Sequence, residues 1–281
     1  MIPTPSQFQK MLSGIVQAVA DVEGQLTERE IACLACLASV RTASGEVLEI
    51  GTFKGRSTIV LAKASQLGPK ERIVAVDPLT SPGATDPVLK GGESSAWEAL
   101  QANLKAAQVE HLVEMHQQYS ADLARTWPAG RKLRLLWIDG DHTYSGAKTD
   151  FDLFSPFLAD GAIVAMHDVL HHHGGPARVF AEDILLSPHF GAAGFSGSIG
   201  WSQYSRDPHR TAAWQMRKLD LYRRLTRVIS YTGFGGDIEG TRKIGYKLAR
   251  ARVSHGDLKP AAWAREVRLP TARVGPAGNG P

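Results

Sequence analysis

Cysteine is scarce in this sequence: Cys33 and Cys36 are the only two among 281 residues. A C-x2-C pair can begin a zinc site, but a closed site needs two further ligands at matching spacing, and no second pair follows. Residues 27–40 have the composition of a helix, so we interpret the cysteines as two small apolar residues on one helix face. The sequence gives no support to a redox function.

Long apolar runs are also missing. No stretch of about 18 uninterrupted apolar residues occurs, as a membrane-spanning helix would require. The N-terminus, MIPTPSQFQK, lacks the basic segment followed by an apolar one that marks a secretory signal peptide. These absences predict a cytoplasmic protein without a transmembrane span.

Charge is distributed unevenly along the chain. From Arg206 onward there are sixteen Lys or Arg against six Asp or Glu, which leaves 16 basic and 22 acidic residues before it. The net charge of +4 therefore combines about −6 over the first 205 residues with about +10 over the last 76. Such a basic segment can bind nucleic acid, an anionic membrane or an acidic substrate, and it can also be an ordinary solvated surface.

Short apolar, β-branched runs alternate with segments of helical composition. This alternation predicts a mostly parallel sheet covered by helices on both faces. The expected strands are residues 46–50, 72–76, 112–116, 135–139 and 162–166, and the expected helices are residues 57–66, 94–107, 120–127, 145–157 and 176–186.

The ends of the chain add further elements. Residues 5–42 have apolar positions at helical spacing and a capping box of Thr27 and Glu30, which predicts two helices before the sheet. A closing β-hairpin is expected at 190–204, a basic amphipathic helix at 207–231 and disorder from about residue 253. The expected division is an N-terminal helical segment (1–43), a Rossmann-like domain (44–205), a basic helical extension (206–252) and a disordered tail (253–281).

A glycine turn follows the first expected strand. The run VLEI leads directly into Gly51-Thr-Phe-Lys-Gly55, at the sheet edge where open α/β sheets bind ligands. Glycine at both positions allows the backbone to approach a ligand closely. The G-x-x-x-G spacing behind Glu49 departs from the G-x-G-x-x-G of dinucleotide binding, so a nicotinamide cofactor is disfavoured.

The second strand ends at Asp77, where a carboxylate can accept hydrogen bonds from ribose hydroxyls or cap the following loop. The pattern E-x-G-x-x-x-G with this aspartate resembles the class I S-adenosylmethionine-dependent methyltransferases over roughly residues 44–205. The resemblance implies a doubly wound, Rossmann-like, mostly parallel seven-stranded sheet with S-adenosyl-L-methionine as cofactor. In that family, residues after strand three, here Gln118 to Ser120, border the adenine. The cofactor-binding residues expected are Glu49, Gly51, Thr52, Phe53, Gly55, Ser57, Asp77, Tyr119, Ser120 and Asp139.

Acids and histidines follow the fourth and fifth strands, in WIDGDHTY and in MHD. Because both strand ends lie at the edge that holds the glycine turn, Asp139, His142, His167 and Asp168 are expected in one pocket. Capping of the next helix is the alternative, and it suffices for Asp141.

I-D-G-D-H-x-Y with a later H-D-V resembles the branch of metal-dependent sugar O-methyltransferases and cephalosporin hydroxylase-like proteins. The resemblance implies Asp139, His167 and Asp168 as metal ligands, and His142 as catalytic base beside Asp139. Histidine at 167 replaces the usual acid, which favours Mn²⁺ or a softer ion over Mg²⁺. A metal-free site in which His142 or His167 takes the proton stays open.

We therefore expect an O-methyltransferase acting on a small polyhydroxylated acceptor, a saccharide or glycosylated metabolite. The alternatives are a metal-dependent hydroxylase-like protein on the same fold and a binding protein that uses its basic C-terminal part. No nucleic-acid partner is expected, and a homo-oligomer is possible. Residues 78–93 form a Gly- and Pro-rich loop placed to close over substrate, and no catalytic role is expected for His171, His172 or His173.

Overall fold

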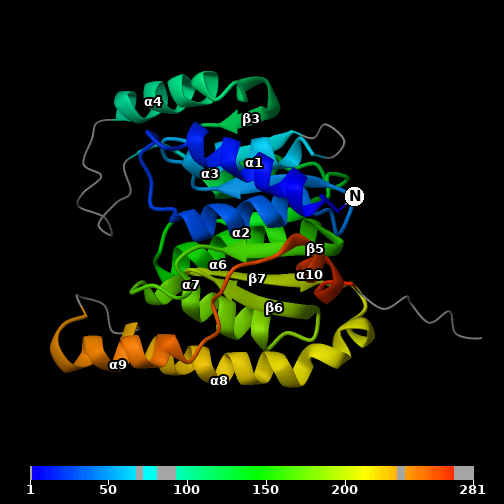
Figure 1. Cartoon of the computed structure of the whole chain (residues 1–281), viewed down its shortest axis with the longest axis vertical. Coiled ribbons are helices and arrows are strands. Elements are labelled where there is room, and N and C mark those ends of the chain that lie inside the picture. Colours follow the sequence, from blue (N-terminus) through cyan, green and yellow to red (C-terminus); the bar gives the residue numbers. More distant parts are fainter. Residues whose placement is uncertain (1, 68–71, 81–92, 233–237, 269–281) are drawn as a thin grey trace, which may run out of the picture.

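A computed structural model describes residues 2–67, 72–80, 93–232 and 238–268, and its centre is one seven-stranded sheet (Figure 1). The strand order is β3-β2-β1-β4-β5-β7-β6, and β7 runs antiparallel to both of its neighbours, β5 and β6. The predicted doubly wound, mostly parallel sheet and its closing hairpin are confirmed. The strands are β1 (Glu46–Ile50), β2 (Ile73–Val76), β3 (Val113–His116), β4 (Leu133–Ile138), β5 (Leu158–Met166), β6 (Phe190–Ser196) and β7 (Ile199–Tyr204).

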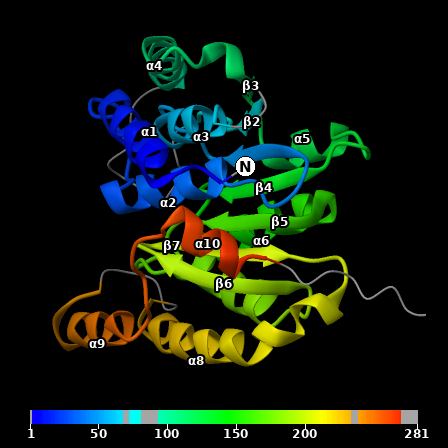
Figure 2. The ribbon, with the colours of Figure 1, turned by 45° about the vertical axis from the view of Figure 1, so that its right-hand side comes forward.

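Helices cover both faces of the sheet and make two apolar cores (Figure 2). The core on one face is contributed by α1 (Pro5–Ala18), α2 (Glu28–Ser39), α3 (Arg56–Ser65), α4 (Glu93–Ala106) and α10 (Pro260–Glu266). The core on the other face is contributed by α5 (Ser120–Thr126), α6 (Tyr144–Phe154), α7 (Gly174–Val179), α8 (Gln215–Thr232) and α9 (Gly240–Ala251). The central strands between these cores are buried on both faces, as their continuous apolar runs require, whereas the edge strand β3 is only partly buried.

β1 lies at the point where the strand order reverses. It pairs in parallel with β2 on one side and with β4 on the other. The loops that follow β1 and β4 therefore diverge to opposite faces and leave a crevice at the carboxyl ends of these strands. Every site residue expected from the sequence follows or ends a strand at this edge, or begins the next helix.

Both N-terminal helices begin with the same capping device. Thr4 with Gln7, and Thr27 with Glu30, form reciprocal capping boxes, of which the second was predicted. α2 is almost entirely buried, and Cys33 and Cys36 lie inside it with no exposed surface. Burial raises the pKa of Cys36 to about 12, so both cysteines are packing residues.

The C-terminal part differs from the sequence prediction. A 3-10 turn, Pro208–Trp214, precedes α8, and the predicted helix at 176–186 continues from α7 as a π-helix, Phe180–Leu185. The expected disorder from residue 253 is wrong for residues 253–268, where α10 forms and buries Trp263. Residues 269–281, and most of the expected loop at 78–93, lie outside the described residues. Among the described helices, none has the length and apolar content needed to span a membrane.

Trp263 fixes α10 to the sheet. Its side chain is 1% exposed, and its ring packs edge-on against Trp201 of β7 with centroids 5.6 Å apart. We expect Trp263→Ala to lower the free energy of unfolding by about 3–5 kcal/mol, the cost of removing a buried aromatic ring. Urea denaturation measures this loss. Trp214→Ala, which removes a half-buried tryptophan, is the matched control and should cost less; equal losses would contradict this role of Trp263.

Candidate functional site

The turn after β1 is held against the end of β4. Gly51 has φ 89°, and a Cβ there would lie 2.2 Å from the Asp139 carbonyl oxygen. Gly55 also has φ 89°, and a Cβ there would lie 2.7 Å from the Leu100 side chain. These glycines are therefore required by close contact and by left-handed backbone. They place the expected cofactor turn directly beside Asp139.

Asp77 organises this turn from the end of β2. Its Oδ2 accepts hydrogen bonds of 2.8 Å from the backbone N–H groups of both Thr52 and Phe53. Its Oδ1 accepts a 2.7 Å bond from the Leu79 N–H, so the capping role considered for Asp77 is also present. Phe53 and Leu79 have positive φ angles, a strained backbone that tends to gather at ligand sites.

Glu49 lies buried behind the turn. Its side chain has no exposed surface, and neither carboxylate oxygen has a hydrogen-bond partner of normal geometry among the described residues. Burial, with the charges of Asp139 and Asp77, raises the pKa of Glu49 to about 8, although the hydroxyls of Ser57 and Thr58 act in the opposite direction. A buried carboxyl without a partner is costly, and a nearby positive charge on a ligand would reduce that cost.

The expected adenine side follows β3. Tyr119 is 60% exposed, an unusual state for a large aromatic side chain, and it precedes α5 at the crevice. The Ser120 hydroxyl donates a hydrogen bond to Asp150 of α6. Burial raises the pKa of Asp150 to about 6. The Gln118 N–H bonds the carbonyl of His116 and keeps this segment close to the strand.

Four side chains from the ends of β4 and β5 meet at the same edge. His142 Nε2 lies 3.3 Å from Asp168 Oδ2 and 3.7 Å from Asp139 Oδ1. His167 Nδ1 lies 3.1 Å from Asp139 Oδ1 and 3.4 Å from Asp168 Oδ1. The two histidines therefore share the two aspartates. Asp168 has φ 56°, a third strained position at this edge after Phe53 and Leu79.

His167 is the buried centre of this cluster, with 4% of its side chain exposed. Burial lowers its pKa, but the charges of Asp139 and Asp168 outweigh burial and raise the pKa well above the ordinary value. Its Nε2 lies 3.8 Å from Glu30 Oε2, and the other oxygen of Glu30 accepts from the backbone and hydroxyl of Ser198. Three carboxylates therefore surround His167 and favour its protonated form.

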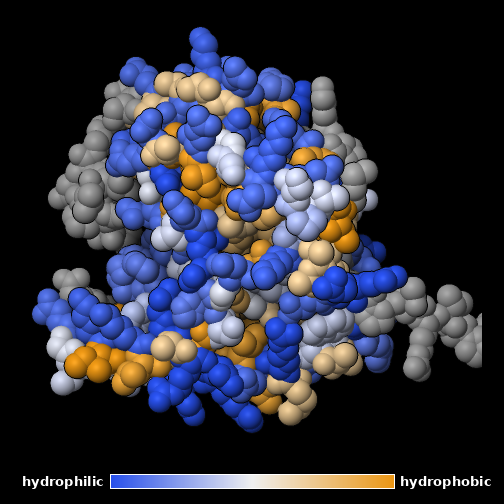
Figure 3. Space-filling model, viewed as in Figure 1, coloured by the Kyte–Doolittle hydropathy of each residue, from blue (hydrophilic) through white to orange (hydrophobic). Residues whose placement is uncertain are grey.

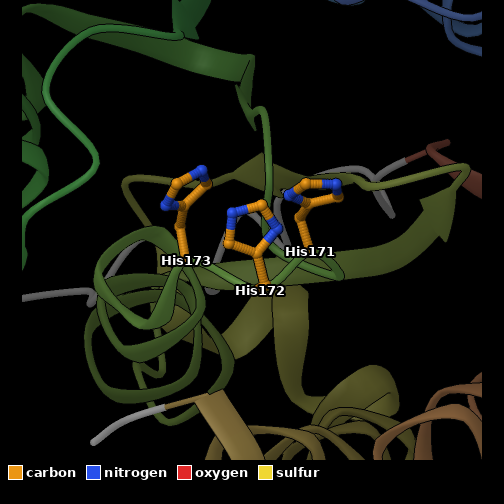
Figure 4. A group of neighbouring side chains, drawn as sticks. All are labelled: His171, His172 and His173. Atoms are coloured by element: carbon orange, nitrogen blue, oxygen red, sulfur yellow. The ribbon is translucent and has the colours of Figure 1, made fainter. Parts of the chain in front are cut away.

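His142 is half-buried and faces the opening of the site. Burial lowers its pKa, but Asp139 and Asp168 outweigh burial and leave the pKa above its ordinary value. Its ring stacks on that of His173, with centroids 4.5 Å apart. The rings of His171, His172 and His173 rise side by side from the loop after β5 (Figure 4).

The expected metal ligands fit magnesium poorly. Imidazole is a poor ligand for this ion, and His167 already lies within 3.4 Å of both Asp139 and Asp168. A different donor set converges: one ligand atom each from His142, Asp168 and His173 lie within 4.8 Å of one another. Two imidazoles with a carboxylate suit Mn²⁺, Fe²⁺ or Zn²⁺.

Three residues of this site were not predicted for it. The capping box accounts for Glu30 in the sequence, so no pattern there predicted a contact between Glu30 of α2 and His167. Asp150 lies in mid-helix with no motif around it. His173 was expected to have no catalytic role, although its position in a run of three histidines was a signal for adventitious metal binding.

Comparison with known proteins agrees with this geometry. Residues 48–169, which include the glycine turn and Asp168, match a family model described as a methyltransferase domain. Over this segment the chain is therefore similar to methyltransferase domains. This similarity agrees with the predicted family.

A curated protein resembles part of this chain. Uncharacterized protein R132 of Acanthamoeba polyphaga mimivirus is 26% identical over 145 residues, which are 50% of this chain and 58% of that protein. The chain thus matches little more than half the length of this curated relative.

Solved structures share the fold of the methyltransferase domain. The O-methyltransferase TomG from Streptomyces achromogenes, in complex with SAM, is 23% identical with a TM-score of 0.51, covering 73% of this chain and 92% of that one. An O-methyltransferase from Bacillus cereus in complex with SAH is 20% identical with a TM-score of 0.50, covering 72% and 93%. The O-methyltransferase NovP is 14% identical with a TM-score of 0.54, covering 71% and 98%.

Proposed function

We propose that this protein transfers a methyl group from S-adenosylmethionine to a hydroxyl of a small polyhydroxylated acceptor, a saccharide or glycosylated metabolite. The observation that carries the proposal is the contact between the Gly51 turn and Asp139, which places the cofactor turn beside the His142 cluster. The O-methyltransferase names of the structural relatives agree with it.

The cofactor site is proposed from the crevice at the carboxyl ends of β1, β2 and β3. The glycine turn leaves room for the methionine part, Asp77 faces the ribose and Tyr119 offers a ring for the adenine. Asp77 and Asp139 give the turn an acidic surrounding, to which Glu49 adds a negative charge once it is ionised, above its pKa of about 8. S-adenosylmethionine supplies an electrophilic methyl group on a sulfonium cation, and this charge fits an acidic surrounding.

His142 is proposed as the general base. The acceptor oxygen attacks the methyl carbon, the bond from carbon to sulfur breaks with its electron pair on sulfur, and the hydroxyl proton passes to the imidazole of His142. Asp139 and Asp168 lie against its Nε2 and stabilise the imidazolium that forms. His167 positions both aspartates as an internal cation. The protein's main task is alignment of the acceptor with the methyl group.

A bound divalent metal is the second candidate for this part of the site. The convergence of His142, Asp168 and His173 favours it over the set first expected from the sequence, Asp139, His167 and Asp168. A metal there would lower the pKa of the acceptor hydroxyl and orient a vicinal diol. His142 would then be a metal ligand and not the base, and a group activated by the metal would take the proton.

Calorimetric titration tests the cofactor. Chelator-treated protein is titrated with S-adenosylmethionine and S-adenosylhomocysteine, alone and with Mg²⁺, Mn²⁺ or Zn²⁺ present. We expect micromolar binding of both molecules without metal. Absence of binding under every condition would overturn the proposal and favour the hydroxylase-like or binding-protein alternatives.

Metal titration of the same protein separates the two roles of His142. Mn²⁺ or Zn²⁺ binding that is lost in both His142→Ala and His173→Ala would support the metal candidate. No specific metal binding would leave His142 as the base.

A further inference from the structure

The helices α8 and α9 carry a surface that methyl transfer does not use. α8 contains five Lys or Arg against one Asp, and α9 contains four Lys or Arg and no acid. Figure 1 places both helices at the end of the molecule opposite α4. The basic excess of the C-terminal part is therefore concentrated on one end of the fold.

The outer face of α9 is apolar. Ile244 is 61% exposed and Leu248 is 55% exposed, and their spacing of four residues puts them on one side of the helix. Lys243 and Lys247 lie next to them and are also exposed. Figure 3 shows apolar residues gathered over α9 and hydrophilic ones over the neighbouring α8. A basic helix with large exposed aliphatic side chains has the composition of a helix that lies in a membrane interface.

Arginines line the junction of the two helices. A cleft of about 290 Å³ lies between α8 and α9, and Arg223, Arg227 and Arg252 are among its lining residues. Arg223 and Arg227 are exposed and form no ion pair with any residue in the described ranges. Arg224, by contrast, is paired with Asp220 of the same helix. Unpaired guanidinium groups beside a cleft offer binding positions for phosphate groups.

This surface is connected to the methyltransferase site. The Tyr246 hydroxyl and Arg250 Nε each donate a 2.9 Å hydrogen bond to the carbonyl oxygen of Leu170. Leu170 lies between Asp168 and the histidine run. α9 is therefore held directly to the loop between Asp168 and the histidine run.

We propose that α8 and α9 dock the protein on an anionic lipid membrane. Ile244 and Leu248 enter the headgroup region, and the surrounding Lys and Arg side chains contact lipid phosphates. Each base near an anionic bilayer strengthens binding by about fivefold. The methyltransferase site then opens beside the membrane surface.

Other occupants fit this surface less well. Nucleic acid would place phosphate groups against the aliphatic side chains of α9. The aromatic residues that could stack on bases pack against the core instead; they are Tyr222, Tyr231 and Tyr246. A second copy of the chain would set two basic surfaces against each other. An anionic membrane matches both the charge and the apolar residues.

Vesicle sedimentation tests the proposal on the full chain. Vesicles of phosphatidylcholine are compared with vesicles that also contain phosphatidylglycerol, at low and high salt. We expect binding only to the anionic vesicles, weaker at high salt. Ile244→Ser with Leu248→Ser, and separately Arg223→Glu with Arg227→Glu, should each reduce binding at least tenfold without changing thermal stability, because all four side chains are exposed.

The matched control changes the same charge at the opposite end of the molecule. Lys10→Glu with Lys105→Glu, on α1 and α4, should leave vesicle binding unchanged. Equal binding to neutral vesicles, or no binding at all, would overturn the proposal. Binding of duplex DNA that is lost with the arginines but not with Ile244 and Leu248 would identify a nucleic-acid surface instead. Self-association abolished by the Ile244 and Leu248 changes, without vesicle binding, would identify a dimer interface.

Discussion

Replacing His142 with alanine is expected to lower turnover by a factor of about 10² to 10⁴, the usual contribution of a positioned general base. Binding of S-adenosylmethionine should stay nearly unchanged, because His142 faces the opening of the site and the cofactor turn is held by Asp77 and Gly51. Release of S-adenosylhomocysteine, measured with a panel of saccharide and catechol acceptors, gives the turnover, and calorimetry gives the binding.

The pH profile of the intact protein provides a second measurement of the same role. A base acts in its neutral form, so kcat/KM should rise with pH through the pKa of His142. Asp139 and Asp168 raise this pKa, which places the rise above the ordinary histidine value of about 6.5. Asp168→Asn removes one of these charges and should move the rise to lower pH.

The control for this prediction is His172→Ala. His172 is exposed and contacts the other two histidines of its run, but neither aspartate of the cluster lies within ion-pair distance of it among the described residues. The turnover and the pH profile of the His172→Ala variant should match those of the intact protein. Full activity of His142→Ala would remove the base assignment, and loss of cofactor binding in that variant would show a structural role.

The position of the site was predictable because of the sheet. Parallel strands bring their carboxyl ends to one edge of the sheet. Acids that follow separate strands must therefore lie near one another at that edge, and the sequence alone is enough to predict this. Glu49, Gly51, Asp77, Asp139 and Asp168 were placed in this way, and the residues lie at that edge. Their roles in binding and catalysis stay predictions.

Contacts between distant segments were not predictable. Glu30 reaches Ser198 and His167 from a helix that precedes the sheet, and its local capping pattern is satisfied without them. The segment that forms α10 was expected to be disordered because of its Pro, Gly, Ala and Arg content. The packing of that ring on Trp201 stabilises the segment. Such tertiary contacts have no local signature in the sequence.

Glu49→Gln is expected to stabilise the protein and weaken its binding of S-adenosylmethionine. The buried carboxyl has its pKa raised to about 8, so the folded state holds a proton that the unfolded state releases near pH 4.5. Stability supplied by this group is therefore present at low pH and is lost as pH rises from about 4.5 through 8. Glutamine keeps the shape and stays neutral, so the variant should gain on the order of 4 kcal/mol relative to the intact protein at pH 8.5.

Thermal unfolding at several pH values measures this gain. The Tm of the variant should exceed that of the intact protein only slightly at pH 4.5, and the difference in Tm should grow to roughly 10 °C at pH 8.5. Glu46→Gln is the matched control, because Glu46 is on the same strand but is partly exposed and paired with Arg131. Its replacement should show no such growth with pH. A difference for Glu49→Gln that is independent of pH would contradict a buried, titrating carboxyl.

Cofactor binding should change in the opposite direction. The negative charges at Glu49, Asp77 and Asp139 favour a sulfonium cation. Removing one of them should weaken the binding of S-adenosylmethionine by about tenfold, which corresponds to about 1.4 kcal/mol. S-adenosylhomocysteine has no sulfonium charge, so its binding should weaken much less. Calorimetry with both molecules at pH 8.5, where the carboxylate of the intact protein is largely ionised, measures the difference. Equal weakening of the two would show that Glu49 acts on the shape of the glycine turn, and unchanged binding of both would show that its charge does not reach the cofactor.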